Sequence, residues 1–165
     1  MRAWVRRVRS VLQLTAGNQE AAYAEAISAI DADPGGPNSA VAAVFAARAA
    51  FWMRDVAKAR VALERQPVQE GTWHVGARRA IEAGIAALEG HAREAGAMYD
   101  SVLAGRLAHG EPFTHALVTL DAVAVLQSEL VPEGAVDSVR AYLEELGAVP
   151  LLARLTSPVD AVVKS

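Results

Sequence analysis

Residues 77–106 constrain the fold of this chain most, because they have the pattern of two amphipathic helices joined by one glycine. Apolar residues recur at helical spacing in both segments, and Gly90 gives the backbone freedom that a tight turn between helices needs. Two helices joined by so short a turn lie antiparallel, and the apolar face of such a hairpin needs another hairpin to cover it. The stripes are Ala77, Ile81, Gly84, Ile85 and Leu88, then Ala95, Tyr99, Val102 and Leu103.

Turn signals divide the rest of the chain into three similar units. Proline, glycine and capping residues separate segments that are rich in alanine, the best helix former. The sequence therefore predicts an all-α domain over residues 1–155 with about eight main helices, a short ninth near residues 150–155, and a loosely ordered tail over 156–165. The other expected helices are 4–14 and 20–30, 38–53 and 56–65, and 113–127 and 133–146, with Pro132 at the first turn of the last.

Composition narrows the possible functions. The chain has no cysteine, which excludes disulfides and thiolate metal sites and makes a reducing cytoplasm the expected location. A net charge of −3 argues against nucleic-acid binding. No apolar run is long enough for a transmembrane span.

The first expected helix carries a local cluster of arginines on one side and apolar residues on the other. Such a helix can bind a membrane surface or a partner, but a solvated charged face is the favoured interpretation. We therefore expect no membrane partner. The arginines are Arg2, Arg6, Arg7 and Arg9.

Small residues recur in the second helix of each unit with a period of roughly 36 to 40 residues. The aligned positions are Ala22, Ala59, Ala95 and Ala135. Twelve positions earlier stand Ser10, Ala47, Ala83 and Val123, where the first helix of each hairpin would cross its partner. Four positions later stand Ala26, Leu63, Tyr99 and Val139, where one repeat would pack on the next.

This pattern resembles the tetratricopeptide repeat (TPR), whose hairpins carry small residues at the helix crossing and a larger apolar residue four positions later. The resemblance implies a right-handed superhelix of about four antiparallel hairpins, an α-solenoid. The bulky aromatic residue that the family has early in the first helix is absent, its position being held by Arg6, Ala43, Arg79 and Thr119. Residues 77–155 are also similar to the helical-repeat region of actinobacterial multidomain transcriptional activators and cyclase-like regulators. The motifs that carry this are Ala87-Leu88-Glu89-Gly90, Pro112-Phe113, the run from Ala116 to Asp121, and Pro150 to Leu155.

Few residues suggest chemistry, and we expect neither an enzyme, a metal nor a cofactor. His109, Glu111 and His115 have metal-ligand chemistry, but they flank a turn where exposed capping roles are favoured. Asp121 lies in an apolar run, where a lone buried carboxylate would be costly. It therefore needs a partner. Arg78, Arg106 and His115 are the candidates, and a general base in a pocket is the less favoured alternative.

The expected function is a protein-interaction scaffold, a regulatory module that binds a protein or peptide on a concave wall formed by the first helix of each hairpin. A homodimerising module and a small-molecule sensor with a pocket between hairpins remain as alternatives. An apolar wall with arginines suits a short apolar peptide that carries an acidic group. The predicted partner-binding residues are Trp4, Arg7, Val44, Arg48, Phe51, Leu117 and Leu120.

Overall fold

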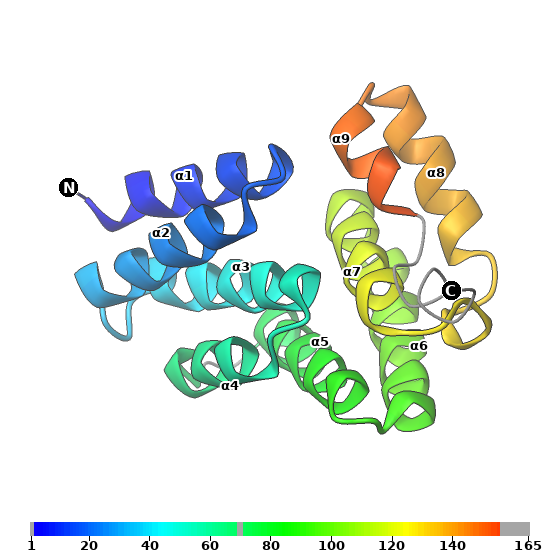
Figure 1. The fold of residues 1–165 in the computed structure, drawn as a ribbon, viewed down its shortest axis with the longest axis horizontal. Helices are drawn as coiled ribbons and strands as arrows, with labels where there is room; N and C mark the ends of the chain where they lie inside the picture. The colour runs from blue at the N-terminus through cyan, green and yellow to red at the C-terminus, as the bar shows by residue number, and fades with distance from the viewer. Residues whose placement is uncertain (1, 69–70, 156–165) are drawn as a thin grey trace.

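A computed structural model describes residues 2–68 and 71–155, and within these ranges the chain consists of helices and short connections without strands (Figure 1). The all-α prediction is confirmed for the described residues, in which eight main helices precede a short ninth. The predicted tail, residues 156–165, lies outside the described residues. The helices are α1 (Ala3–Thr15), α2 (Gln19–Ala32), α3 (Pro37–Met53), α4 (Val56–Arg65), α5 (Thr72–Leu88), α6 (Ala92–Ala108), α7 (Pro112–Val125), α8 (Ala135–Glu145) and α9 (Val149–Leu152), with 3-10 turns η1 (Ser128–Leu130) and η2 (Ala153–Leu155).

The turn at Gly90 forms as the sequence predicts. Gly90 adopts a left-handed φ of 94°, and the N–H of His91 donates to the carbonyl of Ala86 at 2.9 Å. This is the hydrogen-bond pattern of a Schellman motif, which satisfies the last carbonyls of α5. A hairpin of α5 and α6 follows.

The turn between α3 and α4 is built differently. Arg54 takes the left-handed conformation with φ of 57°, although it carries a Cβ. The next residue, Asp55, accepts a hydrogen bond from the backbone N–H of Lys58 at 2.9 Å and so caps α4. The predicted turn at Arg54-Asp55 is confirmed.

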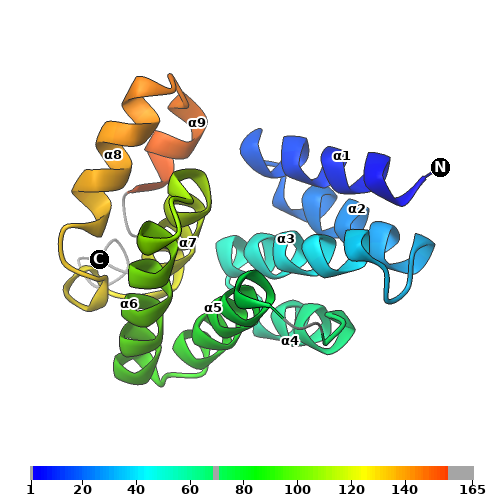
Figure 2. The same cartoon turned by 180° about the vertical axis from the view of Figure 1, so that it is seen from behind.

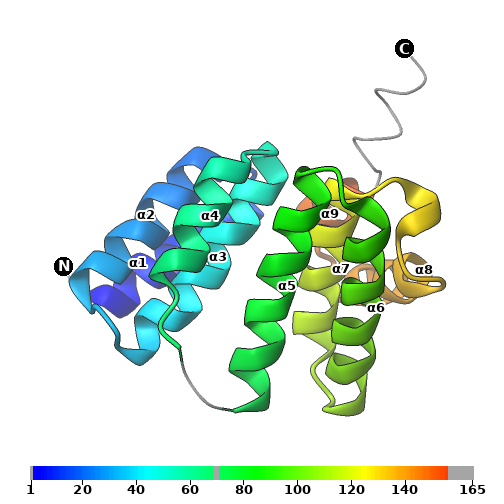
Figure 3. The ribbon, with the colours of Figure 1, turned by 90° about the horizontal axis from the view of Figure 1, so that it is seen from below.

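Helix α3 is the centre of the molecule. It contacts α1 and α2 on one side, α4 beside it, and α5 and α7 on the other side. Seen from behind, α1 to α4 form one group, and α8 and α9 lie beyond α7 on the far side (Figure 2). Helices α3, α5 and α7 begin at the same side of the molecule and run in the same general direction (Figure 3).

The repeat register agrees with burial in the structure. The aligned alanines and the positions twelve before them are all buried. In the first hairpin the hydroxyl of Ser10 donates to the carbonyl of Ala22 at 2.8 Å, which places the crossing of α1 and α2 at the predicted pair. The positions four after the aligned alanines are buried as well, except for the half-buried Leu63.

Two predicted boundaries are wrong. Helix α8 begins at Ala135 and leaves Pro132 in the preceding loop, because Gly134 takes a left-handed φ of 71° that interrupts the helix. Helix α5 begins at Thr72, five residues before the start of the hairpin expected over residues 77–106. The early turn is supported by α6, where Arg106 donates to the carbonyl of Trp73 at 3.1 Å.

Candidate functional site

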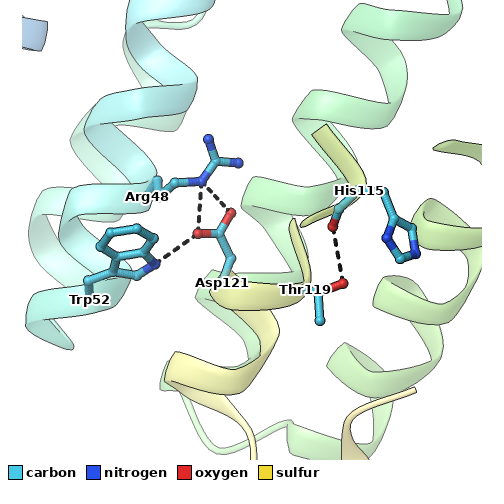
Figure 4. A network of polar contacts seen from close by, with 5 residues as sticks. All are labelled: Arg48, Trp52, His115, Thr119 and Asp121. Atoms are coloured by element: carbon cyan, nitrogen blue, oxygen red, sulfur yellow. Dashed lines mark hydrogen bonds and ion pairs between the residues drawn. The ribbon is translucent and has the colours of Figure 1, made fainter. Parts of the chain in front are cut away.

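A buried ion pair joins α3 to α7. The Nε atom of Arg48 donates to both carboxylate oxygens of Asp121 at 2.9 and 2.8 Å, and the indole N–H of Trp52 donates to one of them at 3.1 Å (Figure 4). Burial raises the pKa of Asp121 to about 6, against the opposing effects of Arg48 and Trp52. Asp121 therefore has the partner that its apolar surroundings require.

The partner is not one of the three candidates from the sequence. Arg78 pairs with Glu82 on its own helix, and Arg106 pairs with Glu111. The third, His115, lies six residues before Asp121 on α7, and its ring points away from the Asp121 carboxylate (Figure 4). The ion pair instead joins residues that are 73 positions apart.

The ion pair uses only the Nε edge of the Arg48 guanidinium. Its two terminal Nη groups point away from Asp121 (Figure 4) and donate no hydrogen bond to any residue in ranges 2–68 and 71–155. The Arg48 side chain as a whole is only 4% exposed. Neither Nη atom is among the fully buried polar atoms that lack a partner in the described chain, so both keep some accessible surface.

A cavity of about 150 Å³ lies beside this fork, between α3, α5 and α7. Its walls are mostly apolar and aromatic, and its charged lining residues are Arg48, Arg106 and Asp121. Apolar walls with a few converging polar groups are typical of small-ligand sites.

Arg106 comes from the last turn of α6 and is also buried. Its Nη1 atom lies 2.8 Å from a carboxylate oxygen of Glu111, and its guanidinium carbon lies 5.9 Å from the centre of the Trp73 ring. Its Nε atom is buried and has no hydrogen-bond partner among the described residues. This nitrogen has almost no accessible surface, so a ligand in the cavity would not reach it.

The structure brings together part of the predicted partner-binding set. Val44, Arg48, Phe51 and Leu117 all line the cavity. Leu120 is buried beside them, in a cluster with Val139 and Leu143 from α8. The sequence analysis missed Trp73 and Arg106, which contribute to the same cavity.

The remaining two predicted residues, Trp4 and Arg7, lie on α1 and do not line this cavity. Trp4, Val8 and Leu12 follow one another at helical spacing and are 51%, 40% and 61% exposed. We call these three residues the α1 stripe. Among the described helices, α1 packs mainly on α2 and α3, so the stripe has no helix over it.

The residues considered as metal ligands are engaged separately. His109 contacts the carbonyl of Gly105 through its ring Nδ1 at 2.6 Å, and Glu111 pairs with Arg106. His115 is buried, which lowers its pKa. No group of three such side chains in the described part of the chain is placed to bind a metal. Across the same residues, no helix has the length and apolarity needed to cross a bilayer.

Comparison with known proteins adds no relative. No family model matches the chain, and no curated protein or solved structure is significantly similar to it.

Proposed function

We propose that this chain is a non-enzymatic protein-interaction module, built as a TPR-like right-handed superhelix of four hairpins. The contact pattern supports this arrangement, because each first helix touches the next along the chain: α1 with α3, α3 with α5, and α5 with α7. The second helices α2, α4 and α6 each pack on the first helix of the following hairpin. Such a stack leaves its end helices covered on one side only.

The α1 stripe is the observation that carries the proposal. An apolar row that includes a tryptophan, on an end helix, is typical of a surface that binds another protein. Helix α1 contains no acidic residue and three arginines, and Arg2 precedes it. Two of them, Arg6 and Arg9, lie 3.5 and 3.6 Å from carboxylate oxygens of Glu25 on α2. The partner that fits this surface is an amphipathic helix with an apolar face and acidic flanks.

This proposal moves the partner-binding surface to α1. Of the residues expected from the sequence, Trp4 and Arg7 remain in it. Arg48, Phe51, Leu117 and Leu120 are buried between helices, so a bound peptide would not reach them without separating α3 from α7.

Site-specific photo-cross-linking tests the proposal. A photo-reactive residue in place of Leu12 is expected to give a discrete product in cells that express the chain, and Trp4→Ala in the same chain is expected to abolish it. Leu107 on α6 is the matched control, since it is 58% exposed and lies on another helix. No product at position 12, or the same product at both positions, would reject α1 as the interaction surface.

A second copy of the chain is the alternative occupant of the α1 stripe. Mass spectrometry of the product distinguishes the two cases. A product of twice the chain mass, together with a dimer in light scattering that Leu12→Ser converts to a monomer, would identify a homodimer.

A further inference from the structure

We propose that the cavity between α3, α5 and α7 binds a small carboxylic acid, whose ring or branched chain fills the apolar part while its carboxylate accepts hydrogen bonds from the Nη groups of Arg48. This site is separate from the α1 stripe, so the two proposals stand or fall independently. The proposal rests on the size of the cavity, the donors of Arg48, the geometry of its guanidinium and the position of the opening.

The size limits the ligand to a small body. A cavity of about 150 Å³ with walls of leucine, isoleucine and phenylalanine accepts benzene in another protein. This cavity has the same volume and includes Phe51, Ile81 and Leu117 among its apolar walls. One six-membered ring, or a branched chain of similar bulk, would fill it.

The donors of Arg48 favour an anion. Arg48, Arg106 and Asp121 are the charged groups of the lining, and Glu111 pairs with Arg106 from outside it. Asp121 engages only the Nε edge of Arg48, so both Nη groups are without an acceptor in the described chain. An incoming acceptor would satisfy donors that the protein leaves unpaired.

The geometry favours a carboxylate over a phosphate. The two Nη groups of a guanidinium form a planar fork that matches the two oxygens of a carboxylate. Asp121 lies on the opposite edge of the same guanidinium and would repel a dianion more strongly than a monoanion. The apolar walls would also penalise the desolvation of a second charge.

The opening lies at one end of the three helices. Val41, Trp73 and Phe113 line the cavity near the first turns of α3, α5 and α7, which start at the same side of the molecule (Figure 3). Phe113 is 42% exposed, so the rim reaches solvent. The N-terminal ends of helices carry partial positive charge, which adds to the attraction for an anion near the rim.

Calorimetric titration of the full chain with benzoate, phenylacetate and 3-methylbutanoate, each compared with its neutral alcohol, tests the proposal. We expect saturable one-to-one binding of at least one acid, tighter than that of its alcohol by about tenfold or more. The indole N–H signals of Trp52 and Trp73 in ¹⁵N NMR spectra should shift with the same affinity. Absence of saturable binding by all three acids, or equal binding of acid and alcohol, would overturn the proposal.

Two variants locate the site. Arg48→Lys keeps a positive charge beside Asp121 but removes the planar fork, so the preference for the acid over its alcohol should disappear. Arg65→Lys makes the same change in the surface pair with Asp31, 2.7 Å long, and should bind the acid like the unmodified chain. Ala77→Val narrows the cavity without altering any charge and should weaken acid and alcohol alike. If Arg48→Lys does not fold, Ala77→Val decides, and unchanged binding by that variant would refute the site.

Discussion

Arg48 and Asp121 form a buried ion pair in which each charge stabilises the fold only while the other is present. Removing both charges from water is costly, and the attraction between them offsets that cost only while both are present. The side chains are each 4% exposed, so little water would reach either group if its partner were removed. The pair is therefore expected to behave as a unit when it is mutated.

A double-mutant cycle should measure a coupling free energy between Arg48 and Asp121. Arg48→Met leaves the Asp121 carboxylate buried without a cation, and we expect a loss of about 3–5 kcal/mol in the free energy of unfolding. Asp121→Asn should cost a similar amount because Arg48 loses its counter-charge, while the amide oxygen still accepts from Trp52. The double variant should be more stable than the sum of the single losses predicts, as measured by urea unfolding. Additive losses would show that the charges do not depend on each other.

The pKa values of two aspartates are shifted in opposite directions: Asp121 pairs with Arg48, and Asp55 caps α4. Burial raises the pKa of Asp121 to about 6, whereas the hydrogen bond from the N–H of Lys58 lowers the pKa of Asp55. Folded protein therefore binds the Asp121 proton more tightly than the unfolded chain, and this group's contribution to stability falls as the pH rises from about 4 to about 6. The contribution of Asp55 is instead lost as the pH falls below about 4. Carboxyl ¹³C NMR titration measures both midpoints, and a midpoint for Asp121 at or below that of Asp55 would contradict the expectation.

At the level of residues, the sequence predicts that a buried charge has a partner, but it does not identify that partner. The apolar run around Asp121 is enough to predict that its carboxylate has a partner on another helix. It does not reveal Arg48, because the two residues are 73 positions apart and the crossing of α3 and α7 depends on the whole stack. Arg106 was considered as that partner and instead forms its own pair with Glu111.

At the scale of helices, α3 and α5 pack closely because Phe51 on α3 faces Gly84 on α5, which has no side chain. The ring of Phe51 lies where a Cβ on Gly84 would be, so the two fit as a knob and a hole. Gly84 lies inside α5, where glycine otherwise lowers stability. Close packing explains why glycine suits this position.

Two glycine substitutions should therefore have opposite effects. Gly84→Ala forces the Phe51 ring to move, and we expect it to lower the free energy of unfolding by about 1–3 kcal/mol. Gly105→Ala, in α6, meets no atom within 4 Å and should raise stability by about 0.5–1 kcal/mol through its effect on the unfolded chain. Thermal unfolding of the two variants measures both, and a neutral or stabilising Gly84→Ala would contradict the packing argument.

Helices and their crossings were the most predictable part of the fold. A repeated small residue marks where two helices meet, and Ser10 with Ala22 meet there. Boundaries failed where one residue overrides the pattern: Gly134 delays α8, and contacts with Arg106 extend α5 to Thr72. The periodic pattern contains no information on such local effects.

At the scale of the whole molecule, the first helices α3, α5 and α7 touch one another. Register alone identifies which residues on them face inward, and Val44, Arg48, Phe51 and Leu117 do meet around one cavity. It does not give the curvature of the stack, because curvature depends on the sizes of all contacting side chains. The sequence predicts an open concave wall on α3, α5 and α7. In the structure these three helices surround a small cavity.

Separating the two halves of the chain tests how far the stack is modular. Helices α1 to α4 contact one another in sequence, so a fragment of residues 1–70 should remain helical by circular dichroism. It loses the bond from Arg54 to the carbonyl of Ala124 and the contact of α3 with α7, and should melt at a lower temperature than the full chain. A matched fragment of residues 71–165 should also retain helix. Loss of helix in both fragments would indicate one cooperative globule.

The distance along the chain between Arg48 and Asp121 also has a consequence during synthesis. Ribosomes add about 5–20 residues per second, so synthesis from Arg48 to Asp121, 73 positions later, requires roughly 4–15 s. During that interval α3 can pack on α1, α2 and α4, but its arginine has no counter-charge and must stay hydrated. The part of α3 that meets α7 therefore remains uncovered on the nascent chain until α7 emerges. The contact between α3 and α7 can form with its charges paired only after Asp121 has been added.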